Sequence, residues 1–200
     1  ACIMAGNVAT YAGADYLAAC SADIINVGIG GGSVCTTRIK TGFGVPNLTA
    51  IKNCARVDRS VVADGGIRYP GDIVKALAFG ADFVMVGSML AGTRPTPGAV
   101  ITQRGAGGEA CRVKCYRGMA SREVQRDFHG GIAEWKTAEG VATEVPYRED
   151  EERIVADIVG GLRSGLTYGG AATIRELQRK LDYIEITPAG RMESLPHRVF

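Results

Sequence analysis

Short runs of apolar residues recur along the first half of the chain, and each is followed within two residues by a glycine. The runs span residues 2–5, 24–27, 61–63 and 83–86. Because apolar side chains on successive residues fit a strand buried on both faces, these runs predict a parallel sheet. The stretches between them are helix-like and span residues 10–20, 48–56 and 70–78. The alternation predicts an α/β fold with right-handed crossovers.

Beyond Gly92 this alternation stops. Residues 93–109 are rich in glycine, proline and threonine, and residues 120–150 are charged, with a glycine pair near their centre. A loop region of this length is usually functional, so we expect a mobile flap over about residues 93–150. The remaining sequence predicts helices at 152–162 and 171–180, a short strand at 182–187 and a tail at 188–200.

Only four strand–helix steps are present, whereas a closed (β/α)₈ barrel needs eight and typically about 250 residues. The chain also begins within a strand-like pattern and shows no linker between separate domains. We therefore expect residues 1–200 to form a single catalytic domain, the C-terminal half of a barrel, with the chain being a fragment. A complete small doubly wound sheet is the alternative, and both folds bind ligands at the carboxyl ends of their strands.

Composition and charge exclude several classes of protein. Glycine makes up 28 of 200 residues, but it is aperiodic and accompanied by only 7 prolines, which excludes collagen. With 46% apolar and 22% charged residues, the chain can bury a core and is not disordered. A net charge of +2 without a basic stripe argues against a nucleic-acid partner. No apolar run reaches the roughly 18 residues of a membrane span, so we expect no membrane association.

The six cysteines are too sparse for a disulfide scaffold, and their spacing does not suggest a zinc site. We therefore expect reduced thiols and a cytoplasmic location. Three of the cysteines fall within the strand and helix patterns, and we expect these to be buried: Cys2, Cys20 and Cys54.

The richest candidate site is the loop 28–38, which contains four glycines, a cysteine and two threonines directly after a predicted strand. Its backbone groups can cradle an anion through N–H groups or a monovalent cation through carbonyls. Cys35 lies in this loop, where an exposed thiolate could act as a nucleophile. A small buried residue is the alternative interpretation of a single cysteine.

Two further strand ends carry candidate binding groups. Asp64 could accept hydrogen bonds from a ribose diol, with the N–H of Gly66 facing a phosphate, although a turn or helix-capping aspartate is the common alternative. Gly87 and Ser88 end the next strand and offer N–H groups and a hydroxyl. Adjacent strand ends of this kind are typical of phosphate-binding barrels.

Taken together, the motifs resemble one family. They are Gly-Ser-Val-Cys-Thr-Thr-Arg at 32–38, Ala-Asp-Gly-Gly at 63–66, the glycines at 87–92, Tyr-Arg-Gly-Met at 116–119 and Gly-Gly-Leu-Arg-Ser at 160–164. In these residues the chain resembles the IMP dehydrogenase/GMP reductase family over essentially its whole length. The resemblance implies a (β/α)₈ barrel, a purine nucleotide substrate, NADP(H) or NAD(H) as cofactor and a homotetramer.

The resemblance also implies roles for individual residues. Cys35 would attack C2 of the purine and form a covalent intermediate, while Asp64 would hold the ribose. The 5′-phosphate would be surrounded by Ser33, Gly66, Gly87, Ser88 and Tyr116. The base would lie against Gly118 and Met119, with Glu139 contacting it. Potassium would be bound by carbonyls of Gly30, Gly32 and Cys35 and by a neighbouring subunit's Glu193, Ser194 and Leu195, although Gly31 replaces the usual proline.

The flap favours one member of the family over the other. Dehydrogenases resemble one another in an Arg-Tyr pair, whereas Arg126 here is followed by aspartate. Residues 130–140 look like a reductase flap, in which Thr37 and Glu139 would relay protons to departing ammonia. We therefore expect a GMP reductase. The tail 189–197 resembles the dehydrogenase instead, so IMP dehydrogenase is the alternative, and a catalytically inactive nucleotide-binding barrel is the alternative outside enzymes.

Overall fold

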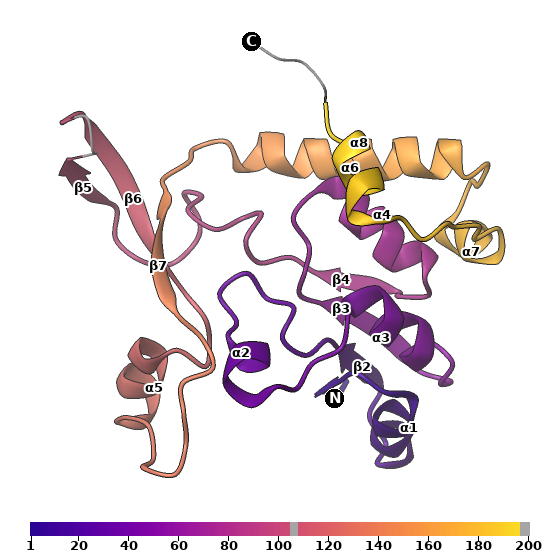
Figure 1. The fold of residues 1–200 in the computed structure, drawn as a ribbon, viewed down its shortest axis with the longest axis horizontal. Helices are drawn as coiled ribbons and strands as arrows, with labels where there is room; N and C mark the ends of the chain where they lie inside the picture. The colour runs from indigo at the N-terminus through magenta and orange to yellow at the C-terminus, as the bar shows by residue number, and fades with distance from the viewer. Residues whose placement is uncertain (105–107, 197–200) are drawn as a thin grey trace.

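The computed structural model describes residues 1–104 and 108–196, and its first half is a four-stranded parallel sheet (Figure 1). The strands lie in the order β1-β2-β3-β4 and span Met4–Val8, Ile24–Val27, Ser60–Asp64 and Phe83–Met85. The helices that connect them are α1 (Tyr11–Ala19), α2 (Thr37–Thr41), α3 (Asn47–Cys54) and α4 (Pro70–Ala78). All four predicted strands and the three predicted helices between them are confirmed, and α2 is an additional short helix after the cysteine loop.

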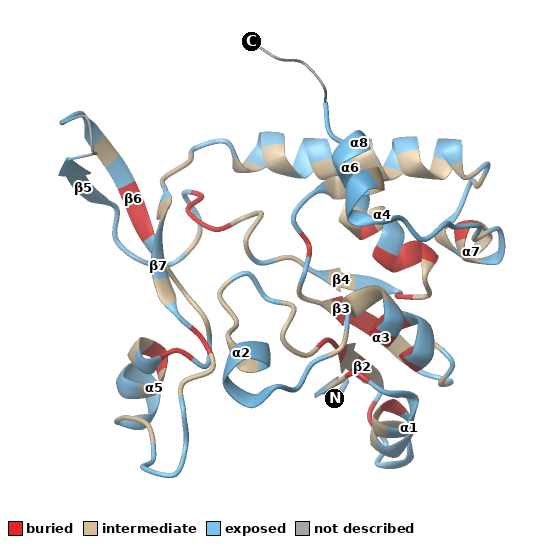
Figure 2. Ribbon diagram, viewed as in Figure 1, coloured by how far each residue is buried: buried red, intermediate tan, exposed pale blue. Residues whose placement is uncertain are grey.

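The core lies between this sheet and α1, α3 and α4, as the buried residues in Figure 2 show. Ile25, Val27 and Val61 are at most 1% exposed, and burying each such side chain stabilises the fold by roughly 1.5–3 kcal/mol. The expectation of strands buried on both faces holds for β3 but is wrong for the outer strands. Met4 of β1 and Phe83 of β4 are at least half exposed, because the described helices do not cover their side of the sheet.

The second half of the chain adds an antiparallel sheet that sequence patterns did not predict. Its strands are β5 (Ile101–Arg104), β6 (Ala110–Arg117) and β7 (Ala142–Pro146), with β6 in the centre. Helix α5 (Arg122–His129) lies between β6 and β7 and begins at Ser121, whose hydroxyl accepts the Val124 N–H. The region 93–150 therefore contains regular structure where the composition suggested only loops.

Helix α6 (Glu151–Tyr168) packs on α4 and is longer than the predicted helix 152–162. A Cβ at Gly165 would lie 2.6 Å from Cγ1 of Val74, so the glycine permits the two helices to approach closely. Helix α7 (Ile174–Arg179) falls within the predicted helix 171–180, and Gln178 donates to the Leu77 and Ala81 carbonyls. Helix α8 (Pro188–Glu193) lies in the predicted tail, whose last residues fall outside the described part of the chain.

Two expectations are wrong. Residues 182–187 form no strand. Instead, the centroids of the Tyr183 and Phe79 rings lie 4.8 Å apart, and the Tyr183 hydroxyl accepts a hydrogen bond from the Lys52 ammonium at 2.6 Å. Cys2 and Cys20 are exposed, because they lie just outside β1 and α1, whereas Cys54 is buried. Burial raises the pKa of the Cys54 thiol to about 11. Within the described residues, no helix is both long and apolar enough to cross a membrane.

Candidate active site

The cysteine loop between β2 and α2 is held in place by a segment more than a hundred residues later. Within the loop, the Cys35 N–H donates to the Gly32 carbonyl at 3.1 Å. The Thr36 N–H donates to the Glu139 carbonyl at 2.8 Å, and the Val141 N–H donates to the Val34 carbonyl at 3.0 Å. The segment that leads into β7 therefore pairs with the backbone on both sides of Cys35.

This pairing brings three predicted catalytic residues into one chain of hydrogen bonds. The Cys35 thiol donates to Thr37 Oγ1 at 3.2 Å, and the Thr37 hydroxyl donates to Glu139 Oε2 at 2.8 Å. The hydroxyl thus links a thiol, which must lose a proton to become a nucleophile, to a carboxylate that can accept one. Cys35 is only half-buried, so the alternative of a fully buried structural cysteine is wrong.

Residues predicted to bind a phosphate also converge. The Ser33 and Tyr116 hydroxyls lie 3.2 Å apart, and a Cβ at Gly87 would lie 3.3 Å from the same Tyr116 hydroxyl. The Ser88 hydroxyl donates to the Ile67 carbonyl at 3.4 Å, beside Gly66. Three strand-end loops and β6 therefore meet at one corner, where hydroxyl groups and glycine backbone are available to an anion.

The Asp64 carboxylate ends β3 and is oriented by two asparagines. Nδ2 of Asn7 and Nδ2 of Asn26 both donate to Asp64 Oδ2 at 2.9 Å, and Asn26 also donates to Asn7 Oδ1 at 3.0 Å. No protein group in the described part of the chain donates to Asp64 Oδ1. One carboxylate oxygen is thus fixed by amides, while the other is available to a ligand hydroxyl.

Sequence reasoning identified neither Asn26 nor Asn7 as a site residue. The available signal was a polar side chain inside an otherwise apolar strand pattern. Asn47 was missed as well: its Nδ2 donates to the carbonyls of Asp64, at 3.0 Å, and Gly65. Gly65 has φ +90° and contacts the Gly31 backbone, where a Cβ would come within 2.9 Å of the Gly31 carbonyl carbon.

The predicted flap residues differ in how close they lie to the cysteine loop. Gly118 lies against the cysteine loop, since a Cβ there would lie 3.2 Å from the Val34 carbonyl oxygen. The Met119 side chain is 77% exposed. Arg126 is exposed as well and pairs with Asp127 at 3.2 Å. A hydrogen bond from Arg117 lowers the pKa of Asp127. In the described structure, neither the Met119 nor the Arg126 side chain joins the hydrogen-bonded groups around Cys35.

The predicted potassium ligands are not gathered by any described contact. The Gly32 carbonyl already accepts the Cys35 N–H, and Glu193, Ser194 and Leu195 lie at the end of α8, where Ser194 donates to the Gly190 carbonyl. The described residues contain no group of three or more His, Cys, Asp or Glu side chains placed to hold a metal. Potassium binding through the carbonyls of Gly30, Gly32 and Cys35 stays a prediction.

Arg38 is a cation that sequence reasoning did not assign. Its Nη2 donates to the Ile29 carbonyl at 3.2 Å and to the Val45 carbonyl at 2.6 Å. The guanidinium therefore ties the start of the cysteine loop to the segment that follows α2. Because these contacts are made to backbone carbonyls, Arg38 supports the loop's conformation.

Comparisons with known proteins agree with this geometry. The family described as "IMP dehydrogenase / GMP reductase domain" matches residues 1–197. The chain is 47% identical over 98% of its length to inosine-5'-monophosphate dehydrogenase of Thermoplasma acidophilum. The chain spans about half the length of the curated relatives it matches, from 41 to 53%.

Two solved structures are similar over nearly the whole chain. Inosine 5' monophosphate dehydrogenase from Legionella pneumophila is 70% identical, with a TM-score of 0.79 over 95% of this chain and 58% of that one. A cysteine-to-alanine variant of GMP reductase from Trypanosoma brucei, in complex with guanosine 5'-monophosphate, is 40% identical, with a TM-score of 0.90 over 100% of this chain and 41% of that one. The predicted α/β fold is confirmed, and the chain belongs to the IMP dehydrogenase/GMP reductase family.

Proposed function

We propose that the protein is a GMP reductase, which converts GMP and NADPH to IMP, ammonia and NADP⁺. The hydrogen-bonded chain from the Cys35 thiol through Thr37 to Glu139 supports the covalent chemistry, and the observation that carries the choice of the reductase is the flap, in which Asp127 rather than a tyrosine follows Arg126. A reductase must expel the amino group of guanine as ammonia, which requires a proton at that nitrogen. A thiol, a hydroxyl and a carboxylate joined by hydrogen bonds can supply both the nucleophile and that proton.

The reaction balances in two stages. The Cys35 thiol gives its proton through Thr37 to Glu139, and the sulfur bonds to C2 of the purine. Glu139 returns the proton to the amino group, the C2–N bond breaks and ammonia departs, which leaves a Cys35–C2 thioimidate. A hydride equivalent then reaches C2, the C2–S bond breaks, and IMP and the Cys35 thiolate are formed. The thiolate takes a proton from solution to restore the enzyme.

NAD(P)H supplies that hydride when it is bound. A pocket of about 320 Å³ lies beside Glu139 and is lined by Thr36, Lys40, Arg122 and Gly140, among others. The Glu123 carboxylate also lines the pocket, and the two cationic side chains outnumber it and suit a phosphate-bearing part of the dinucleotide. The Thr36 hydroxyl is buried there and has no protein partner within the described residues. This donor set fits part of the cofactor, and we assign Lys40 and Arg122 to holding it.

The nucleotide would be held at its two ends by the groups already described. Asp64 Oδ1 would accept the ribose hydroxyls, and the Ser33, Ser88 and Tyr116 hydroxyls with Gly66 and Gly87 would surround the phosphate. The complex named for the Trypanosoma brucei relative, GMP reductase with guanosine 5'-monophosphate, supports this choice of substrate.

IMP dehydrogenase is the second candidate, and one observation favours it: the Legionella pneumophila relative, at 70% identity, carries that name. A dehydrogenase must hydrolyse its covalent intermediate, so it needs a base for water. In this chain the flap arginine, Arg126, is instead paired with Asp127 and exposed. Because Asp127 stands where the dehydrogenase flap carries a tyrosine, and because residues 130–140 resemble a reductase flap, we place the reductase first.

The deciding experiment uses the full-length protein with two substrate mixtures, GMP plus NADPH and IMP plus NAD⁺. Absorbance at 340 nm follows cofactor oxidation in the first mixture and cofactor reduction in the second. We expect turnover of GMP with ammonia released in equal amount. Turnover only in the IMP mixture would reverse the ranking. A Cys35→Ala variant separates an enzyme from a nucleotide-binding barrel, because it should bind GMP and lose all turnover.

A further inference from the structure

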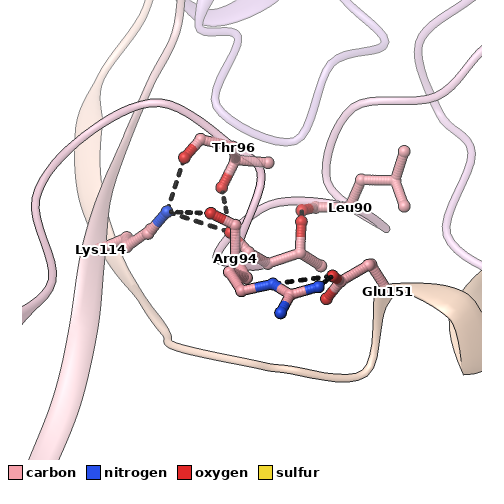
Figure 3. A network of polar contacts seen from close by, with 6 residues as sticks. Leu90, Arg94, Thr96, Lys114 and Glu151 are labelled. Atoms are coloured by element: carbon pink, nitrogen blue, oxygen red, sulfur yellow. Dashed lines mark hydrogen bonds and ion pairs between the residues drawn. The ribbon is translucent and has the colours of Figure 1, made fainter.

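A buried lysine lies in the second sheet, away from the cysteine loop. Lys114 is 3% exposed, and none of the described carboxylates forms an ion pair with it. Its ammonium group donates instead to three backbone carbonyls: Thr93 at 3.1 Å, Arg94 at 3.1 Å and Thr96 at 2.6 Å (Figure 3). A buried cation is costly unless every donor is satisfied. All three donors of Lys114 are satisfied, and all by one turn.

The turn that Lys114 binds follows directly from the predicted phosphate corner. Gly87 and Ser88 lie in the loop after β4, and the chain reaches the 93–96 turn five residues after Ser88. Within the turn, the Thr96 hydroxyl donates to the Thr93 carbonyl at 2.7 Å. Arg148 donates to two further carbonyls of this loop, those of Met89 and Ala91, at 2.7 and 2.8 Å. The loop after β4 is therefore held by hydrogen bonds from two cationic side chains, Lys114 and Arg148.

The same strand that carries Lys114 also carries Tyr116. Successive strand side chains alternate between faces, so Lys114 and Tyr116 share one face of β6. From Lys114 onward β6 pairs only with β7, because its pairing with β5 covers residues 110–113. Along this part of β6, no described strand pairs with the edge opposite β7, and Lys114 provides the contact to the 93–96 turn.

We propose that Lys114 is a positioning residue for the phosphate site, acting by fixing the loop after β4 relative to β6. The loop contributes Gly87, β6 contributes the Tyr116 hydroxyl, and a Cβ at Gly87 would lie 3.3 Å from that hydroxyl. Without the ammonium, the turn loses three hydrogen bonds to β6, the Thr93 carbonyl keeps only its donors from Thr96 within the turn, and the turn can move away from the strand. The inference rests on the proposed function in one respect, namely that Tyr116 and Gly87 bind the 5′-phosphate of a mononucleotide.

A double-mutant cycle tests this role in the full-length protein, with GMP affinity measured by titration calorimetry. Losing charged hydrogen bonds in Lys114→Met should weaken GMP binding about tenfold. Arg112→Met is the matched control, since Arg112 lies on the same face of β6 but is largely exposed; it should change the affinity less than about twofold. In a Tyr116→Phe background, Lys114→Met should cost less than about threefold, because the hydroxyl it positions is already gone.

Several results would overturn the role of Lys114. A Lys114→Met penalty of the same size with and without the Tyr116 hydroxyl would mean that the lysine acts independently of the phosphate site. Should Lys114→Met fail to fold, Thr96→Val loosens the same turn more gently, and its penalty of about threefold must likewise shrink in the Tyr116→Phe background. Binding is measured rather than turnover, so an inactive reductase with normal GMP affinity would refute only the proposed function. Failure of wild-type protein to bind GMP would refute both.

Discussion

Replacing Thr37 by valine removes the hydroxyl that joins the Cys35 thiol to the Glu139 carboxylate. Valine has nearly the shape of threonine, so the first turn of α2 and its packing stay intact. Two hydrogen bonds are lost, of 3.2 and 2.8 Å, and the direct path for the proton is broken. General acid–base catalysis typically contributes a factor of 10² to 10⁴, so we expect kcat for GMP to fall about 100-fold. That factor corresponds to roughly 2.7 kcal/mol of transition-state stabilisation.

Steady-state kinetics with GMP and NADPH checks this expectation. Among the described residues, the Thr37 hydroxyl forms its hydrogen bonds with Cys35 and Glu139, so kcat and kcat/KM should fall together while KM stays within about twofold. Thr37→Ser is the matched control: it keeps the hydroxyl and should retain kcat within about threefold. If Thr37→Val kept more than a third of wild-type kcat, or if Thr37→Ser were as slow as Thr37→Val, the relay through this hydroxyl would be refuted.

Three further predictions follow from burial and hydrogen bonding. Asn26→Leu removes one of the two amides that orient the Asp64 carboxylate, so KM should rise about tenfold for GMP but less than about threefold for 2′-deoxy-GMP. Equal rises for the two nucleotides would contradict recognition of the ribose by Asp64. Ile25→Ala should lower the free energy of unfolding, measured in urea, by about 3 kcal/mol. Ile39→Ala, at a position that is 83% exposed, should lower it by less than about 0.5 kcal/mol. Burial raises the pKa of the Cys54 thiol to about 11, so the unfolded state loses that proton first and stability should fall as the pH rises from about 9. Cys54→Ala should show a flatter pH dependence.

The parallel sheet was predictable because its strands consist mainly of apolar residues, which indicates that they are buried. Ile25 and Val61 belong to apolar runs, and the predicted helix before β4 ends close to Gly80. The antiparallel sheet lacked this signal. All four residues of β5 are exposed, so Ile101–Arg104 is a strand because β6 offers it a pairing edge. The opposite error occurred at residues 182–187, which have strand-like composition but pair with no described strand.

For the site, the strand-end positions of Cys35 and Asp64 followed from the apolar pattern alone. Glu139 was reached only through the family resemblance, since no local pattern distinguishes it from other flap carboxylates. Its approach to Thr37 depends on backbone pairing between the cysteine loop and the segment before β7. Asn26 was missed because a polar residue in an apolar strand does not reveal its partner, and the pairing of β2 with β3 places that partner, Asp64, beside it.

The sequence by itself determined the class of fold, the edge of the sheet at which the candidate site lies and the family, because each depends on local composition or on contiguous motifs. The tertiary structure alone decided which groups touch. It linked Cys35 to Glu139 through Thr37, set two asparagines on one oxygen of Asp64 and buried the Lys114 ammonium among three carbonyls. Apart from the Cys35–Thr37 hydrogen bond, these contacts join residues 18 to 102 positions apart. Such pairings depend on strand register and loop docking, and local composition does not specify either of them.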